Sequence, residues 1–235
     1  MSATAETVQT VDLASTPLRE LNQRLHDQAG KEDPERHWRV LNPSGAHALA
    51  CGVDAPIEVE IMGHAGYYCA GMNKQASITV RGNAGVGLAE NIMSGVVRVT
   101  GSASQAAGAT ARGGLIVIEG DASARCGISL KGGDIVVHGS VGHMSAFMAQ
   151  TGRIVVLGDA GDALGDSLYE ATLYVRGRIK SLGADAHVED MTDADCSKVG
   201  DLLKRAGFSY DPTEFKRVAS KRSLYHWNAD AGQEY

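Results

Sequence analysis

Two consecutive stretches, LIVIEGDASARCGISLKGG (115–133) and DIVVHGSVGHMSAFMAQTG (134–152), carry the same pattern of residue types at the same nineteen positions. Each begins with a short aliphatic run, reaches a glycine at its sixth position, and continues through small and polar residues. The pattern recurs in seven consecutive rows from Glu58 to residue 190, with no insertion. Internal repeats of fixed period indicate a stacked architecture in which each repeat packs on its neighbours.

The columns of these rows show what each position does. The second and fourth columns are aliphatic in every row; in the row 115–133 they hold Ile116 and Ile118. Two aliphatic residues separated by one position are typical of a strand with one buried face. The thirteenth column always holds alanine or glycine. The sixth column, which we interpret as a shared corner, is glycine throughout: Gly63, Gly82, Gly101, Gly120, Gly139, Gly158 and Gly177.

We therefore predict an all-β fold, a single-stranded parallel β-helix of about seven 19-residue coils with short helical flanks at both ends. The lack of a hexapeptide rhythm favours the right-handed form. We expect the corner glycines to be needed because a positive φ is free for glycine. The predicted organisation is a capping helix and lead-in over 1–57, the β-helix over 58–190, and a helix with a tail over 191–235.

Helix signals lie on both sides of the repeats, where the open ends of a solenoid need covering. On the N-terminal side, Thr16 is a candidate N-cap with Pro17 at the first helical position, followed by a stripe of leucines. On the C-terminal side, Thr192 and Asp195 have the spacing of a capping box, and the apolar face that follows stops at Gly207. Both segments are predicted to be helices.

Apolar residues also occur in two places outside the buried columns, namely the third column of the repeats and the tail beyond Gly207. The third column, which points away from them, changes from polar residues in the first three rows to apolar ones in the last four. Such a stripe is either covered by a flanking segment or forms an interface. The tail beyond Gly207 mixes aromatic and basic residues, and it either packs along its own β-helix or docks on a partner. The candidate interface residues are Val117, Val136, Val155, Tyr174, Phe215, Arg217, Arg222, Tyr225 and Trp227.

The stretch GNAGVGLAENIMSG (82–95) looks in isolation like a loop that cradles a phosphate. Its glycines, however, have the spacing GxxGxG, and another strand-like row follows where a dinucleotide-binding motif has a helix. We therefore interpret the stretch as a corner and return path of the second coil. Accordingly, we expect no cofactor on this chain.

Other chemical signals are weak. Asp121 and Asp159 share the seventh column, and turn chemistry explains this Asp/Asn/Ser column better than the acid pair of a polysaccharide-cleaving enzyme. His138 and His143 lie at different corners of one coil, and no further ligand completes a metal site there. We therefore predict no catalytic and no metal-binding residue.

The cysteines and the overall composition narrow the class of protein further. Cys69 and Cys126 lie three coils apart, roughly 14 Å, which is too far for a disulfide. The formal net charge of −6 argues against nucleic acid as a partner, and no apolar run is long enough to span a membrane. The four cysteines lack zinc-ligand spacing and the first ten residues lack the features of a signal peptide, so we expect a cytoplasmic protein.

The repeated corners, in rows such as GNAGVGLAENIMSGVVRVTG and GGLIVIEGDASARCGISLKGG, resemble the glycine-rich β-helix domain at the C-terminus of the glutamate synthase large subunit. The resemblance covers about 58–190. The lead-in VLNPSGAHALACG, the coil with GYYCAGMN and the tail EFKRVASKRSLYHW look more particularly like the stand-alone subunit of N-methylglutamate synthase and related split complexes. The β-helix chain of formylmethanofuran dehydrogenase has a similar repeat and is the alternative.

The resemblance implies a structural subunit of a hetero-oligomer. It would buttress a glutaminase-type amidotransferase-like subunit against an FMN-dependent synthase subunit that also holds an iron–sulfur cluster, and the complex would make N-methylglutamate from methylamine and glutamate. A different class, an independent β-helix enzyme acting on a polysaccharide or an acyl donor, would need an acid pair that we do not find. These expectations concern partners and cofactors outside this chain.

Overall fold

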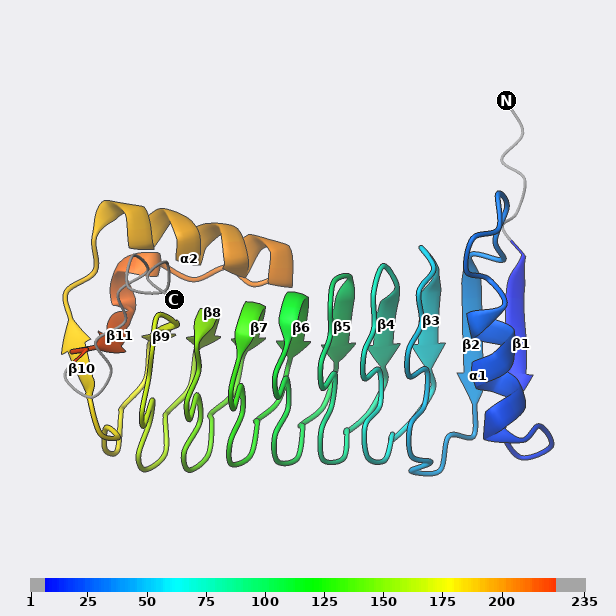
Figure 1. The fold of residues 1–235 in the computed structure, drawn as a ribbon, viewed down its shortest axis with the longest axis horizontal. Helices are drawn as coiled ribbons and strands as arrows, with labels where there is room; N and C mark the ends of the chain where they lie inside the picture. The colour runs from blue at the N-terminus through cyan, green and yellow to red at the C-terminus, as the bar shows by residue number, and fades with distance from the viewer. Residues whose placement is uncertain (1–6, 223–235) are drawn as a thin grey trace, which may run out of the picture.

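The computed structural model describes residues 7–222, and it shows a rod built around one sheet of eleven strands (Figure 1). The sheet order is β1-β2-β3-β4-β5-β6-β7-β8-β9-β11-β10, so neighbours in the sheet are almost always neighbours in sequence. The elements are β1 (Val8–Asp12), α1 (Leu18–His26), β2 (His37–Leu41), β3 (Glu58–Ile61), β4 (Ser77–Val80), β5 (Val96–Val99), β6 (Arg112–Ile118), β7 (Lys131–Val137), β8 (Thr151–Val156), β9 (Thr172–Val175), β10 (Ala186–Glu189), α2 (Asp193–Ala206), a 3-10 turn at Pro212–Glu214, and β11 (Lys216–Ser220).

The predicted all-β parallel solenoid is confirmed. Strands β3 to β9 pair in parallel, and each residue of the core faces the residue nineteen positions later, as Ile116 faces Ile135 and Ile135 faces Ile154. The second and fourth columns are at most 2% exposed in all seven rows. The aliphatic columns thus form continuous ladders inside the rod, and this burial supplies the main stabilisation of a chain that has few aromatic residues.

The parallel ladder also continues before Glu58, which the nineteen-residue period did not indicate. His37 pairs with Glu58, and the amide of Ser77 donates to the carbonyl of Ile57, so residues 37–57 form a further coil of twenty-one residues. β1 then pairs in parallel with β2. Two additional residues in this coil shift it out of the fixed period, although its strand keeps the same register.

The physical reason for the corner glycines differs from the prediction. Among the seven, only Gly63 has a φ in the left-handed region. The others are needed because consecutive corners touch: the amide of Gly139 donates to the carbonyl of Gly120 at 3.0 Å, and a Cβ added at Gly139 would lie 2.6 Å from that carbonyl oxygen. Close backbone approach, rather than backbone conformation, therefore explains this column.

The left-handed conformation occurs on the return path instead. In the thirteenth column, the alanines Ala70 and Ala146 and the glycines Gly108 and Gly127 have φ between 55° and 68°. Small residues recur there because a positive φ penalises larger side chains and the site is buried.

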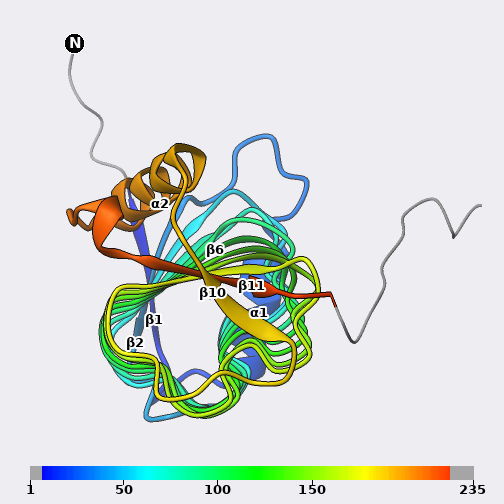
Figure 2. The same ribbon diagram turned by 90° about the vertical axis from the view of Figure 1, so that its left-hand side faces the viewer.

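Short elements close both ends of the rod. At the N-terminal end, Leu21 and Leu25 of α1 are fully buried in the core. The helix begins one residue later than predicted, because Pro17 rather than Thr16 occupies the N-cap position and makes no side-chain capping bond. At the other end, β11 lies antiparallel between β9 and β10, and β10 crosses the end of the solenoid (Figure 2). Neither strand of this second cap is indicated by the residue pattern of the sequence.

The second helix follows its sequence signals closely. Thr192 and Asp195 form the predicted capping box, and Gly207 ends α2 in the left-handed conformation. The helix then lies along the outer face of the sheet over the C-terminal part of the rod (Figure 1). This position decides what becomes of the apolar stripe in the third column.

Candidate interaction surface

Helix α2 covers the apolar stripe, so these residues are not available to a partner. Val117, Val136 and Val155 have no exposed surface, and Tyr174 is 1% exposed. They pack in a second core with one face of the helix, formed by Val199, Leu202, Leu203 and Ala206. Of the two interpretations of the stripe, coverage by a flanking segment is therefore correct, and its assignment as an interface is wrong.

The tail packs on its own solenoid as far as the structure describes it. Phe215 is 4% exposed in the second core, and Arg217 lies in β11, so both are corrected from interface to internal contacts. Arg222 is exposed and pairs with Glu170. Tyr225 and Trp227 lie outside the described residues.

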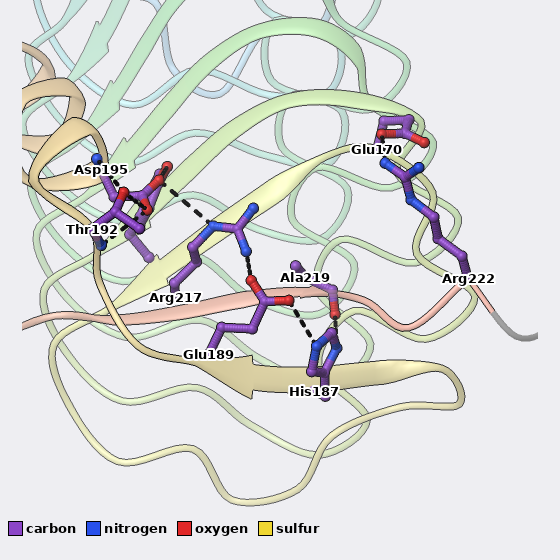
Figure 3. Close-up of polar contacts among 9 residues, drawn as sticks. Glu170, His187, Glu189, Thr192, Asp195, Arg217, Ala219 and Arg222 are labelled. Atoms are coloured by element: carbon purple, nitrogen blue, oxygen red, sulfur yellow. Dashed lines mark hydrogen bonds and ion pairs between the residues drawn. The ribbon is translucent and has the colours of Figure 1, made fainter. Parts of the chain in front are cut away.

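A polar network joins α2 to the cap (Figure 3). Asp195 accepts hydrogen bonds from the hydroxyls of Tyr174 at 2.7 Å and Thr192 at 2.6 Å, and Arg217 lies 3.6 Å from the same carboxylate. Glu189 binds Arg217 on one side and His187 on the other. Burial works to raise the pKa of Asp195, but the hydrogen bonds from Thr192 and Tyr174 outweigh it and hold the pKa below its ordinary value. The network fastens the helix and the cap to each other.

Two arginine clusters hold the rest of the helix. Asp134, which is buried, receives both a bidentate contact from Arg153 at 2.7 and 2.9 Å and a contact from Arg205 of α2 at 3.2 Å. Arg98 donates to the last carbonyl of the helix, that of Ala206, at 2.6 Å. A cation at a helix C-terminus is favourable because it complements the unpaired carbonyls and the helix dipole.

The seventh column forms a ladder of side chains along one corner of the rod. The backbone amide of each coil is bound by the side chain one coil earlier, as Ser140 N donates to Asp121 Oδ1 at 2.7 Å and Arg178 N donates to Asp159 Oδ1 at 2.7 Å. Asp121 and Asp159 thus satisfy backbone donors between coils. These bonds link consecutive coils, whereas the predicted turn chemistry would satisfy backbone groups within one coil.

The histidines and cysteines considered in the sequence, His138, His143, Cys69 and Cys126, have different surroundings. His138 Nε2 lies 2.9 Å from the hydroxyl of Tyr210 beside the second core, whereas His143 is exposed on the return path. Within residues 7–222, no three His, Cys, Asp or Glu side chains gather in a group that could hold a metal ion. Cys69 and Cys126 are free and fully buried, and burial raises the pKa of each thiol to about 12.

Among residues 7–222, the most exposed large apolar side chains lie on the return path of the first nineteen-residue coil (58–76), which we call the first coil. Tyr67, Tyr68 and Met72 are each about half exposed (50%, 49% and 54%). Beside them lies a cavity of about 360 Å³ whose lining includes Tyr68, Met72, Cys51 and Glu90. We call these four residues together with Tyr67 the Tyr–Met surface. In the sequence, GYYCAGMN stood out only for its resemblance, and the bulk of these residues in columns that are small or polar in most other rows was the available signal.

Two glycines of GNAGVG lie against rings of the Tyr–Met surface. A Cβ at Gly87 would lie 2.7 Å from Cδ1 of Tyr68, whereas one at Gly85 would lie 2.7 Å from the carbonyl carbon of Gly66 and 3.0 Å from Cδ1 of Tyr67. The two rings of the first coil therefore lie over glycines of the second. His47 stacks on the Tyr67 ring, with the ring centroids 4.5 Å apart. The glycines that resemble a phosphate loop in the sequence therefore pack beneath two aromatic rings of the preceding coil.

Comparison with known proteins places the chain in a family. Within the described residues, neither helix is long and apolar enough to cross a membrane. No family model matches the chain. Protein GlxC of Rhizobium meliloti (strain 1021) is 57% identical over 227 residues, which cover 96% of this chain and 99% of that protein. At this identity and coverage two chains share their fold along their whole length, and the chain belongs to the GlxC family.

Proposed function

We propose that this chain is a non-catalytic structural subunit of a glutamate synthase-like heteromeric enzyme, most specifically of an N-methylglutamate synthase. It would hold a glutaminase-type amidotransferase-like subunit against an FMN-binding synthase subunit. The flavin and the iron–sulfur cluster would belong to the synthase subunit. The complex would transfer an amino group to form N-methylglutamate from methylamine and glutamate.

The observation that carries the proposal is a contrast between closed clusters and an open surface. The charged clusters around Asp134 and Asp195 are engaged by partners that fasten α2 and the cap. The Tyr–Met surface, in contrast, exposes about half of three large apolar side chains. A rigid rod with such a surface is suited to holding other proteins in a fixed geometry, since Tyr and Met are enriched in protein interfaces.

The choice of complex rests on the resemblance of the coils to the glutamate synthase β-helix domain and on the family membership. The repeat in both is the same glycine-cornered coil, and the GlxC match extends beyond the coils to both flanks. A β-helix that serves as an assembly element in a fused enzyme can do so as a separate chain, because each coil contacts only its neighbours and the rod folds as a unit.

The test is reconstitution. The chain is co-expressed with the amidotransferase-like and FMN-binding synthase-like chains encoded in the same organism, and the affinity-purified material is analysed for composition, flavin and iron. We expect the three chains to elute together in fixed ratio, and methylamine-dependent consumption of glutamate to require all three. A chain that elutes alone, or that assembles with subunits of a formyl-transferring complex instead, would contradict the proposal.

A further inference from the structure

The cleft of the Tyr–Met surface has the chemistry of a receptor for a single long cationic side chain. We infer that Tyr68, Met72 and Glu90 receive an arginine of a partner protein, and that the first coil thereby docks this partner. The inference rests on the proposed function in one respect, since the partner is expected to be one of the other subunits. It goes further by naming the docking coil and the anchoring chemistry.

The folding of the coil does not require these side chains. In the column of Tyr68, coils three and six carry Ala106 and Ala163, which adopt the same left-handed conformation (φ 59° and 54°, against 57° for Tyr68). In the column of Met72, coil four carries Ser129 with φ 51°. Coil five carries Met144 and Met148 in the same two columns at φ 54° and 52°, but both are partly buried. Tyr68 and Met72 differ from them in being about half exposed, so a role outside folding accounts for their exposed surface.

The rings are held in place before any partner arrives. Tyr68 lies over Gly87, and Tyr67 lies over Gly85 and stacks on His47. Glycine at position 87 leaves the space that the Tyr68 ring occupies. Because side chains that are already ordered lose little conformational entropy on binding, such a surface gains affinity by preorganisation. Rigid aromatic residues beside a pocket are also the usual composition of binding hot spots.

The negative charge of Glu90 favours a positively charged group in the cleft. Its carboxylate lies in the lining of the cleft, near the Cys51 thiol, and it has no hydrogen-bond or ion-pair partner among residues 7–222. Lys74, the one cation of the first coil, is engaged by Asp54 at 2.7 Å. An arginine would lay its aliphatic stem against Met72, place its guanidinium over the Tyr68 ring, and pair with Glu90. Its planar, weakly hydrated head suits this aromatic and acidic lining better than the ammonium of a lysine.

The same charge disfavours a second copy of this chain as the occupant. A two-fold symmetric contact through the surface would bring two Glu90 carboxylates into one interface, with the lysine of each first coil already bound to Asp54. Like charges in one interface are repulsive. A different protein that supplies the cation has no such cost.

The affinity of the reconstituted complex tests the inference first. With the partner chains immobilised, we expect Tyr68→Ala and Met72→Ser each to raise the Kd about tenfold or more, and Glu90→Arg to raise it by about a hundredfold. Both truncations copy residues that other coils carry in those columns, so the fold is preserved, and thermal unfolding of each variant verifies this. Glu32→Arg, an exposed charge reversal on the N-terminal loop, and Val188→Ala, a truncation at the opposite end of the rod, are the matched controls and should bind as wild type.

Photo-crosslinking identifies the occupant. p-Benzoylphenylalanine is placed at Met72, and as a control at Gln105 of the third coil, in cells of the source organism. We expect position 72 alone to crosslink one other protein, through a peptide that contains an arginine. Changing that arginine to glutamate should restore about tenfold or more of the affinity that Glu90→Arg removes.

The outcomes separate the two proposals. If the three chains assemble but the cleft variants bind as wild type, the docking inference is wrong and the proposed function stands. If the wild-type chain fails to assemble with those subunits, the proposed function is wrong, and the crosslink decides the inference. A crosslink to an arginine of another protein, with the charge swap restoring binding, upholds it. A crosslink to a second copy, to the chain's own tail, or none above the control overturns it.

Discussion

The outer face of the sheet has two halves that differ in what lies on them. Over β6 to β9 the third column is apolar and α2 covers it, whereas over β2 to β4 the same column carries Arg39, Glu60 and Thr79 and faces outward without a helix. In the open half Glu60 lies between two arginines, and the hydrogen bond from Arg81 holds its pKa below the ordinary value. One repeated scaffold thus supports two surfaces, and a single column of side chains decides which forms.

The boundary between the halves is equally informative. Arg98 is the last polar residue of the column, and it is the residue that binds the C-terminal carbonyl of α2. The apolar stripe and the helix therefore end at the same strand. The length of α2 matches the length of the apolar stripe, because from Arg98 toward the N-terminal end of the rod the third column is polar.

The largest effect should come from charging the covered half. Val136→Lys places a cation where the wild-type side chain has no exposed surface, and we expect a loss of about 3–5 kcal/mol in the free energy of unfolding. Thr79→Lys, in the same column of the open half, should change it by less than about 0.5 kcal/mol. Urea denaturation followed by circular dichroism measures both. Equal losses would show that α2 does not separate the halves.

A corner glycine should matter equally in both halves. Gly139→Ala in the covered half and Gly82→Ala in the open half both force a Cβ against the preceding corner, at 2.6 Å from Gly120 O and 2.8 Å from Gly63 C. We expect each to cost about 1–3 kcal/mol by overpacking, measured in the same denaturation assay. If one of the two is tolerated, the stacked corner is not uniform along the rod.

Removing the boundary residue should loosen the end of the helix. Arg98→Ala deletes the contact with Ala206 and the ion pair with Glu119, and we expect a loss of about 1–2 kcal/mol because the contacts are partly exposed. Hydrogen exchange should show faster exchange in the last turn of α2. Arg81→Ala, which breaks an exposed pair with Glu60, serves as control, with an expected cost of about 0.5 kcal/mol or less. Unchanged protection of the last turn in Arg98→Ala would contradict the capping role.

Acid should weaken the covered half through Asp195. Its folded-state pKa lies below the ordinary value of 3.8, so its contribution is present above that pH and is lost as the pH falls through the folded-state pKa. We expect wild type to lose about 1 kcal/mol more than Asp195→Asn between pH 5 and pH 3. Denaturation at both pH values gives the difference. Parallel losses in the two proteins would remove Asp195 from the acid response.

The coils could be predicted well from the sequence because their determinants are local and repeated. The aliphatic columns, the capping box at Thr192 and the C-cap at Gly207 each act within one coil or one helix, so residue spacing suffices to predict them. The coil over 37–57 was missed because two additional residues break the period while strand pairing preserves the register. The repeat period counts residues along the chain, whereas the register is set by hydrogen bonds between strands, so a coil of a different length can still pair in register.

The parts that could not be predicted depend on contacts between distant segments. KRVAS (216–220) has no strong strand signal, and it becomes β11 because β9 and β10 offer edges to pair with. The cover of the third column by α2 was one of two open interpretations, since spacing alone does not say where a helix will lie. The Tyr–Met surface was overlooked because its meaning comes from exposure, which the sequence does not report.

The reversal of strand direction at β11 has a consequence for how molecules of this kind could stack. A parallel solenoid whose terminal coils leave the core open would invite end-to-end growth into filaments, because a second copy could extend the aliphatic ladders. Here α1 buries Leu21 and Leu25 in the core at the near end, while at the far end β11 reverses direction and β10 crosses the solenoid. The core is therefore closed at both ends, and a fold that could polymerise is held to a discrete length.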